Sequence, residues 1–248
     1  MLELKNVSKT YTQNNQQVEA IKNLNLSVKE REFIALVGPS GCGKTTLLKI
    51  IAGLIPATNG EVILDGKKIL NPGKDRGLVF QQFTLFPWLT VRENISFGLD
   101  LQNVDSKKKT KIANHYLNIT GLKDFAKFYP KNLSGGMQQR VAIARTLANN
   151  PKILLMDEPF GSLDSQTRSQ MQEFLTKLWE AEHQTILFIT HDVSEAVFLA
   201  DTVYVLDKRP MKIKNTFSVP FNRPRVHSLK YKKEFFEFEN KIAQNLEL

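Results

Sequence analysis

The sequence predicts an α/β fold in which a mainly parallel sheet carries helices on both faces and is interrupted by a helical insertion. Three observations lead to this prediction. Apolar strand-like runs alternate with helical patterns over residues 153–206, an order typical of parallel sheets. A strand, a glycine-rich loop and a helix follow one another over residues 33–51. Between these regions, residues 90–148 are mainly helical in pattern.

The first part of the chain is expected to be rich in short strands. Residues 2–7 and 18–28 alternate apolar and polar side chains, as half-buried strands do. Two further strands, at 61–64 and 67–69, flank Asp65-Gly66, a dipeptide that favours a hairpin turn. We expect these strands to form an antiparallel N-terminal β subdomain.

The remaining elements follow from longer patterns. Buried strands are expected at 33–37, 77–80, 153–156, 185–190 and 203–206. Helices are expected at 90–101, 107–119, 136–148, 165–181 and 193–199. Beyond residue 208 the pattern predicts one or two strands, a turn near Arg223-Pro224 and a last helix. We therefore predict one domain, with a core of about 1–82 and 151–207, a helical subdomain of about 83–150 and a basic tail over 208–248.

The composition is that of an ordinary soluble globular protein, with 42% hydrophobic and 24% charged residues in 248. No apolar run approaches the ~20 residues that span a bilayer, and residues 1–5 lack the start of a secretory signal. A cytoplasmic protein is expected, which is compatible with a place against a membrane protein. Cys42 is the one cysteine, so an internal disulfide and a cysteine-based metal cage are excluded.

The net charge of +9 is confined to one segment. Residues 208–233 contain nine lysines and arginines and no acidic residue, and the rest of the chain is formally neutral. Such a segment can touch anionic lipid or RNA, but a solvated surface is the commoner explanation and is favoured. Its aromatics are not interleaved with the cations as in a base-stacking groove, so no nucleic-acid partner is expected.

The glycine-rich loop is the most informative motif. It reads Gly38, Pro39, Ser40, Gly41, Cys42, Gly43, Lys44 and Thr45, and it leads into an apolar helical stripe. Glycines let the backbone N–H groups turn toward phosphate oxygens, and the following helix start favours negative charge. Lys44 is expected to bind the β- and γ-phosphates, and the Thr45 hydroxyl is expected to bind Mg²⁺. Cys42 either simply fits as a small residue, which is favoured, or has a lowered thiol pKa and is reactive.

Two carboxylates close the strand at 153–156. In a parallel sheet the ligand lies at the carboxyl ends of the strands, so Asp157 and Glu158 are expected to face the loop. Asp157 is placed to hold Mg²⁺, directly or through water. Glu158 is placed to accept a proton from an attacking water, an effect of typically ~10²–10⁴-fold in rate.

A second anion site is expected at the start of the helix near residue 136. Ser134, Gly135 and Gly136 combine a hydroxyl, bare backbone N–H groups and the positive end of a helix. The simpler alternative is that Ser134 is an ordinary N-cap residue. One chain thus has two phosphate-binding helix ends and one loop lysine. A head-to-tail homodimer is the simplest arrangement, in which each nucleotide lies between the loop of one copy and Ser134 of the other.

Together these motifs, in this order, resemble an ATP-binding cassette (ABC) ATPase. The loop at 38–45, the Leu133–Gln138 signature and the strand end at 155–158 carry the resemblance, which covers nearly the whole chain. Met137 stands where much of the family has Gln. Because Ser134 and the two glycines would reach the phosphate, we expect little effect of this difference.

The resemblance implies further site residues. Tyr11 would stack on adenine, Thr46 would join the ATP-binding loop, and Gln81 would touch Mg²⁺ or water and signal to a membrane subunit. Asp164 would cross the dimer interface, and His191 would contact the γ-phosphate as the switch histidine. Plain packing of Tyr11, Gln82 in place of Gln81 and a structural role for His191 are the alternatives.

A transporter ATPase subunit is the expected kind of cassette, with ATP and Mg²⁺ as ligands. It would dock a permease through the aromatic segment 83–89, whose alternative role is internal core. The amino-acid sequences at 79–99 and 158–206 resemble those of ATPases of importers for nitrate, alkanesulfonates, taurine and pyrimidine precursors of thiamine. No separate regulatory domain and only an indirect role of a solute-binding protein are expected. A soluble cassette acting on nucleic acid and a phosphotransferase are the rival hypotheses.

Overall fold

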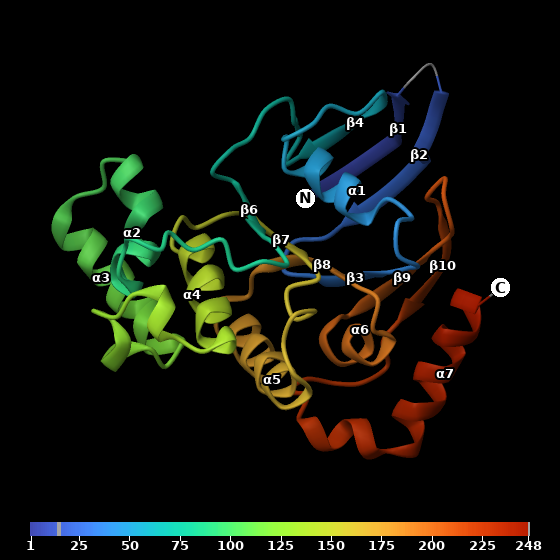
Figure 1. The fold of residues 1–248 in the computed structure, drawn as a ribbon. Coiled ribbons are helices and arrows are strands. Elements are labelled where there is room, and N and C mark those ends of the chain that lie inside the picture. The colour runs from blue at the N-terminus through green and yellow to red at the C-terminus, as the bar shows by residue number, and fades with distance from the viewer. Residues whose placement is uncertain (14–15, 248) are drawn as a thin grey trace.

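Two sheets and the helices around them make up the structure, a computed structural model that describes residues 1–13 and 16–247 (Figure 1). The α/β fold with a mainly parallel sheet, an antiparallel N-terminal sheet and a helical insertion is confirmed.

The N-terminal sheet has the strand order β2-β1-β4-β5 and is antiparallel throughout. Its strands are β1 (Leu2–Gln13), β2 (Gln16–Val28), β4 (Asn59–Leu64) and β5 (Lys67–Lys68). β1 is longer than expected because its polar second half pairs with the start of β2. Asp65 and Gly66 both have positive φ, 48° and 74°, which the predicted hairpin turn between β4 and β5 requires.

The main sheet has the order β10-β9-β3-β8-β7-β6. Its strands are β3 (Phe33–Val37), β6 (Arg76–Val79), β7 (Ile153–Asp157), β8 (Thr185–Thr190), β9 (Thr202–Leu206) and β10 (Ile213–Ser218). All neighbours are parallel except the edge pair β9 and β10. Their carboxyl ends therefore meet at one edge of the sheet, where ligands of such folds bind.

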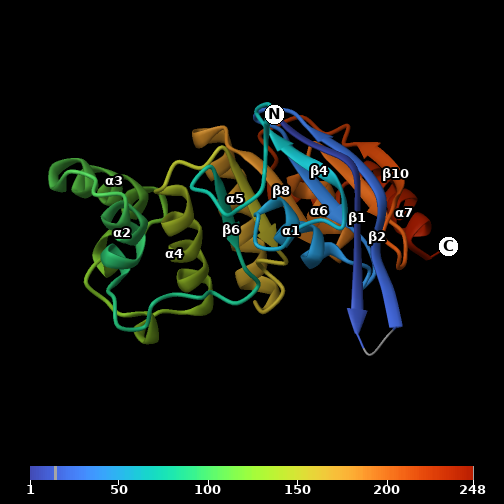
Figure 2. The same ribbon diagram turned by 90° about the horizontal axis from the view of Figure 1, so that it is seen from above.

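Helices flank the main sheet and form the insertion. On the sheet lie α1 (Lys44–Ile51), α5 (Ser165–Glu182) and α6 (Val193–Leu199). The insertion contains α2 (Val91–Leu101), α3 (Ser106–Ile119) and α4 (Gly135–Leu147) and lies at the end of the molecule away from β1 and β2 (Figure 2). Thr90 and Glu93 form a reciprocal capping box that begins α2, because the side chain of each accepts a hydrogen bond from the backbone N–H of the other.

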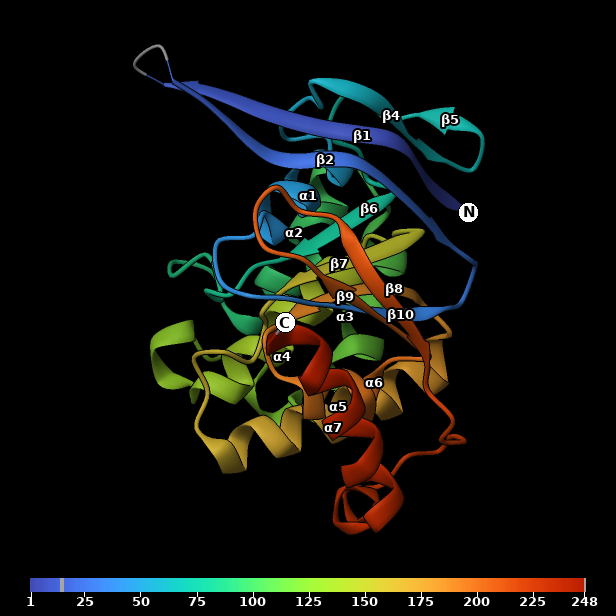
Figure 3. The same cartoon turned by 90° about the vertical axis from the view of Figure 1, so that its right-hand side faces the viewer.

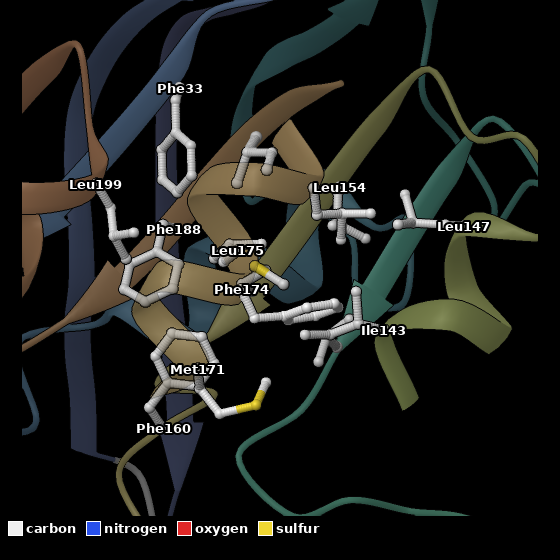
Figure 4. Packing of buried hydrophobic residues seen from close by; sticks show 14 of the residues in the cluster. Phe33, Ile143, Leu147, Leu154, Phe160, Met171, Phe174, Leu175, Phe188 and Leu199 are labelled. Atoms are coloured by element: carbon white, nitrogen blue, oxygen red, sulfur yellow. The ribbon is translucent and has the colours of Figure 1, made fainter. Parts of the chain in front are cut away.

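The main sheet separates two apolar clusters. Phe33 and Phe188 point to one face, where they pack with Phe160 and Leu175 (Figure 4). Ile34 belongs to the cluster on the other face, together with the apolar side of α1 and the N-terminal sheet. Because successive strand residues face opposite sides, the continuous apolar run of β3 fills both clusters. This burial holds the loop that follows β3 between them.

The C-terminal part continues from β10 through a 3₁₀ turn (His227–Tyr231) into α7 (Lys233–Glu247), which packs against α6 (Figure 3). This agrees with the strand, turn and last helix that the sequence predicts. Across residues 1–13 and 16–247, no helix has the length and apolar character needed to cross a membrane.

Candidate nucleotide site

The glycine-rich loop occupies the predicted place, between the end of β3 and the start of α1. Gly41 and Gly43 have φ of 74° and 120°, a region that side chains with a Cβ rarely adopt. A Cβ on Gly43 would also lie only 2.9 Å from the Ala20 carbonyl oxygen. The loop therefore needs glycine at 43 for both backbone conformation and space.

Lys44 lies folded back over this loop. Its Nζ donates hydrogen bonds to the carbonyls of Gly38 (2.7 Å) and Pro39 (3.0 Å), and the side chain is buried. The ammonium is also 3.9 Å from Oε1 of Glu158. The charge is thus held at the loop.

A depression of about 360 Å³ opens beside Lys44. It is lined by Ser40, Gly41, Gly43, Lys44, Thr45, Thr46, Gln81, Asp157, Glu158 and Arg209. Loop residues, strand-end acids and Gln81 therefore come together at one place, as the parallel topology predicts.

Cys42 is buried in the loop, and this burial raises the pKa of its thiol. The raising effect is larger than the lowering effect of nearby Lys44. A thiol with a raised pKa has little thiolate at neutral pH. The alternative of a lowered pKa is therefore wrong, and the interpretation of Cys42 as a small residue that fits the loop is the better one.

Asp157 ends β7 and lies against the first turn of α1. Burial raises the pKa of its carboxyl, while a hydrogen bond with the Thr45 side chain acts in the opposite direction. Thr45, Asp157 and Gln81 therefore bring oxygen atoms to the same depression. Mg²⁺ prefers hydroxyl, carboxylate and amide oxygens, so this donor set fits the ion.

Glu158 has an uncommon backbone conformation, with φ of 44°. A left-handed conformation in a residue with a long side chain costs about 1–3 kcal/mol and is concentrated at functional sites. Its N–H donates to the Ile189 carbonyl (3.0 Å), which ties the residue to β8. Its Oε2 lies 2.9 Å from Nδ1 of His191, which follows β8 directly.

Tyr11 lies beside the first turn of α1. Its hydroxyl is 3.4 Å from Oγ1 of Thr46, and 42% of the residue is exposed. Lys9 Nζ sits 5.2 Å from the centre of the Tyr11 ring. An exposed ring beside the loop is available for stacking, in contrast to a ring used only for packing.

Ser134, Gly135 and Gly136 lie at the start of α4, outside this depression. The Ser134 hydroxyl accepts a hydrogen bond from Met137 N–H (3.3 Å), which is the N-cap arrangement. Asp164 caps α5 in the same way by accepting from Thr167 N–H (2.9 Å), and these bonds lower the pKa of its carboxyl. Both residues have local structural roles in one chain, and a role toward a partner stays a prediction.

The aromatic segment 83–89 divides between two environments. Phe83 and Leu85 pack against the core, whereas Trp88 is 70% exposed. Phe86 lines a cleft of about 320 Å³ between β6 and the insertion, together with Phe97 and Arg145. The core alternative therefore holds for part of the segment, whereas Phe86 faces the cleft and Trp88 faces solvent.

Arg209, in the loop between β9 and β10, is not among the site residues predicted from the sequence. Its Nη2 donates to the Gly41 carbonyl (2.9 Å), and its side chain lines the depression. The charge run at 208–233 contained this arginine, but no spacing marked it as different from its neighbours.

The basic segment is not simply solvated. Arg225 is buried, and Arg223 and Lys230 are partly buried and hydrogen-bonded to internal groups. The favoured expectation of a solvated surface is thus wrong for these three cations. Long charged side chains can be buried when they are paired, and a linear sequence does not display such partners.

A glycine-rich loop before α1, a lysine held in it and two acids at the end of β7 define a nucleotide-hydrolysing protein of the phosphate-loop class. The sequence profile described as ABC transporter matches residues 21–161. The chain belongs to the ABC transporter family, as one of its ATP-binding ATPase proteins.

Several known proteins are similar over almost the whole chain. The nitrate import ATP-binding protein NrtD of Synechocystis sp. is 47% identical, over 99% of this chain and 94% of its own. The aliphatic sulfonates import ATP-binding protein SsuB of Bacillus cereus is 44% identical, over 97% and 94%. A dimeric post-hydrolysis ATP-binding cassette bound to ADP and Pi has a TM-score of 0.77 and 39% identity, covering 90% of this chain and 100% of its own.

Proposed function

We propose that this ABC ATPase is the ATP-hydrolysing subunit of an importer for a small anionic solute of the nitrate or sulfonate type. It would work on the cytoplasmic face of a membrane, bound to a separate permease. The single observation that carries the proposal is that Lys44 and Glu158 line one depression, with Nδ1 of His191 2.9 Å from the Glu158 carboxylate. The names of the similar nitrate and sulfonate import proteins support transport into the cell and the class of solute.

Within one chain, each site residue has a distinct role. Lys44 and the backbone N–H groups of 38–46 would bind the phosphates of ATP, and Tyr11 would stack on the base. Thr45, Asp157 and Gln81 would hold Mg²⁺, which when bound neutralises charge on the phosphates. Glu158 would accept the proton of the attacking water, and His191 would orient that carboxylate and contact the γ-phosphate.

The second half of the site would come from another copy. Ser134, Gly135, Gly136 and Asp164 lie outside the depression that contains Lys44, so a head-to-tail homodimer would bring them to the nucleotide. The dimeric state of a similar cassette bound to ADP and Pi supports this arrangement. ATP would favour the closed dimer, because it adds contacts that only the dimer offers, and hydrolysis would reopen it.

The permease would bind at the cleft beside β6. This cleft lies between the strand that precedes Gln81 and the insertion, and it combines Phe86 and Phe97 with Arg145. Trp88, two residues after Phe86 in the sequence, is exposed. A helix end of the permease with apolar and acidic side chains would complement this lining. The solute-binding protein would act through the permease and not touch this chain.

A co-purification experiment tests the proposal. The tagged chain is isolated from detergent-solubilised membranes of its own cell, and the co-purified material is analysed for integral membrane proteins and for nucleic acid. We expect a permease to co-purify with the chain, in an amount that nuclease treatment does not change. Recovery of nucleic acid without a permease would instead support the rival class of cassette. Deletion of the gene, followed by uptake assays with nitrate, taurine and alkanesulfonates, then identifies the solute.

The nucleic-acid rival has less support once the basic segment is seen in three dimensions. Arg223, Arg225 and Lys230 are engaged inside the protein, which removes three of its nine cations from any external phosphate backbone. A phosphotransferase would need an acceptor in place of water. The Glu158 carboxylate lines the depression and is in contact with His191, an arrangement suited to water activation.

A further inference from the structure

Three cations of the basic segment point into the protein and touch the two helices that follow site residues. We call residues 223–230 the C-terminal clamp. The helices are α5, which begins after Asp164, and α6, which begins after His191 and Asp192. Buried lysine and arginine side chains carry a large desolvation and entropy cost. Their partners therefore show what the clamp holds.

Arg225 binds the end of α6. Its Nη1 donates to the carbonyls of Val197 (3.2 Å), Phe198 (3.2 Å) and Ala200 (2.7 Å), and only 5% of the residue is exposed. The last carbonyls of a helix lack partners inside the helix and carry partial negative charge. Burial lowers the pKa of Arg225 to about 10, so the guanidinium stays charged at neutral pH. Arg225 thus caps α6.

Arg223 joins the same helix end to α5. Its Nη2 donates to the Leu199 carbonyl (2.6 Å), and it forms an ion pair with Asp201 (2.9 Å). Its guanidinium carbon also lies 3.9 Å from the centre of the Trp179 ring on α5. This stacking is favourable for a weakly hydrated guanidinium.

Lys230 connects the clamp to the middle of α5 and to the first turn of α6. Its Nζ donates to Oε1 of Gln172 on α5 (2.7 Å), and Nε2 of Gln172 donates to Oε1 of Glu195 on α6 (3.0 Å). Gln172 and Glu195 are almost fully buried, with 2% and 4% exposed. Removing the lysine would leave the buried amide oxygen of Gln172 without this donor. An unsatisfied buried acceptor destabilises the folded state, because its lost hydration is not replaced.

The same chain of contacts continues to the switch histidine. The Glu195 N–H donates to the Asp192 side chain (3.0 Å), and the Asp192 N–H donates to the Thr190 hydroxyl (3.0 Å). His191 lies between Thr190 and Asp192, with Nδ1 2.9 Å from Glu158. The start of α6, where Glu195 lies, is therefore hydrogen-bonded to the short backbone segment that carries His191.

We propose that Lys230 is a positioning residue for catalysis, which acts through Gln172 and Glu195 to hold His191 against the Glu158 carboxylate. This inference rests on the proposed roles of His191 and Glu158. Catalytic groups work within small tolerances, and a displacement of about 1 Å can cost ~10²-fold in rate. The C-terminal clamp would then be part of the hydrolytic machinery, although it lies outside every nucleotide motif.

The matched pair Lys230→Met and Lys232→Met tests this role. Methionine keeps an unbranched apolar stem and removes the donor, and Lys232 is an exposed lysine two residues away. We expect kcat for ATP hydrolysis to fall about tenfold or more in Lys230→Met, with the Kd for ATP within about twofold of wild type. Lys232→Met should match wild type in both, and Lys230→Arg should recover most of the kcat.

A spectroscopic measurement separates positioning from a loss of stability. The chain has four histidines, so their imidazole NMR signals can be assigned with single His→Gln variants. In Lys230→Met the His191 signal should shift, whereas the signal of His115, on α3, should stay in place. Neither should shift in Lys232→Met.

A normal kcat in folded Lys230→Met overturns the proposal, as does a kcat loss with an unmoved His191 signal. If Lys230→Met does not fold, Lys230→Gln is measured in the same way, and failure of both to fold assigns Lys230 to stability alone and overturns the proposal. The His191→Ala variant distinguishes a failure of the proposed role of His191 from a failure of the proposed role of Lys230. If it retains full ATPase activity, the assigned role of His191 fails; if it is inactive while Lys230→Met is normal, only the clamp proposal fails.

Discussion

Nδ1 of His191 lies 2.9 Å from Oε2 of Glu158, and these two residues come from the ends of neighbouring parallel strands. The other oxygen of the same carboxylate is 3.9 Å from Nζ of Lys44. One carboxylate therefore joins the ends of β7 and β8 to the start of α1. The phosphate loop, the acids after β7 and the histidine after β8 therefore form one site, whose residues can be tested individually by substitution.

Glu158→Gln should abolish turnover and keep nucleotide binding. The amide cannot accept the proton of the attacking water, so we expect kcat to fall about 10²–10⁴-fold. Size-exclusion chromatography with ATP should show a dimer that persists because hydrolysis no longer dissolves it. Wild-type rates of phosphate release in this variant would remove Glu158 from its assigned role.

Lys44→Ala should lose tight ATP binding. The ammonium is held at the loop by two carbonyls and is placed to make charge-assisted bonds worth about 1.5–3 kcal/mol to phosphate. We expect the Kd for ATP, measured by calorimetry, to rise at least about tenfold. Lys49→Ala, an exposed lysine on the same helix, is the matched control and should bind normally. Equal affinities of both variants would contradict the site.

Tyr11→Ala should weaken ATP binding by about 1–3 kcal/mol, the value of stacking a base on an aromatic ring. Tyr11→Phe keeps the ring and loses only the hydroxyl near Thr46, so it should bind almost as wild type. Fluorescence titration with ATP and with inorganic triphosphate separates base from phosphate contacts. A loss of triphosphate affinity as large as the loss for ATP would show that Tyr11 does not contact the base.

Trp88→Ala should release the permease without harming the ATPase. This indole is exposed and its ring centre lies 5.6 Å from that of Phe86, which lines the cleft; aromatic side chains are common anchors of interfaces. We expect co-purification with the permease to fall several-fold, while the basal ATPase rate of the isolated chain stays unchanged. Leu70→Ala, at an equally exposed position outside the cleft, is the control. Undiminished recovery of the permease with Trp88→Ala would place the docking surface elsewhere.

Glu195→Gln should make the protein more stable at neutral pH. Burial raises the pKa of the Glu195 carboxyl above its ordinary value of 4.5. Between these two pKa values the folded state holds a proton that the unfolded state has lost, so the free energy of unfolding falls as pH rises through that range. Each pKa difference of one corresponds to about 1.4 kcal/mol.

The neutral amide at 195 has no such dependence. Urea unfolding from pH 4 to pH 8 should show the two proteins alike at the acidic end and the variant more stable at the neutral end. Asp192 adds to the raised pKa, while Thr190, Gln172 and Arg168 oppose it, and Lys230 lies one hydrogen bond further away. Parallel stability curves over the whole range would show that Glu195 does not titrate differently in the folded state.

Much of the site was predictable because its signals are local. A loop that must approach phosphate needs glycines and a helix start at fixed spacing, and the positive φ of Gly41 and Gly43 bears this out. Acids after a continuous apolar strand must lie at the carboxyl edge of a parallel sheet, which is where Asp157 and Glu158 are. The domain boundaries and the contribution of a second copy stay predictions.

The class of fold, the phosphate loop and the strand that carries the acids follow from the sequence alone, since each depends on short-range patterns along the chain. The contact of Arg209 with the loop and the hydrogen bond of Lys230 to Gln172, 58 residues away, are visible only in three dimensions. The physical reason is that a charged side chain is buried or exposed according to the partners it meets in space. Those partners come from elements whose approach depends on the packing of the whole core.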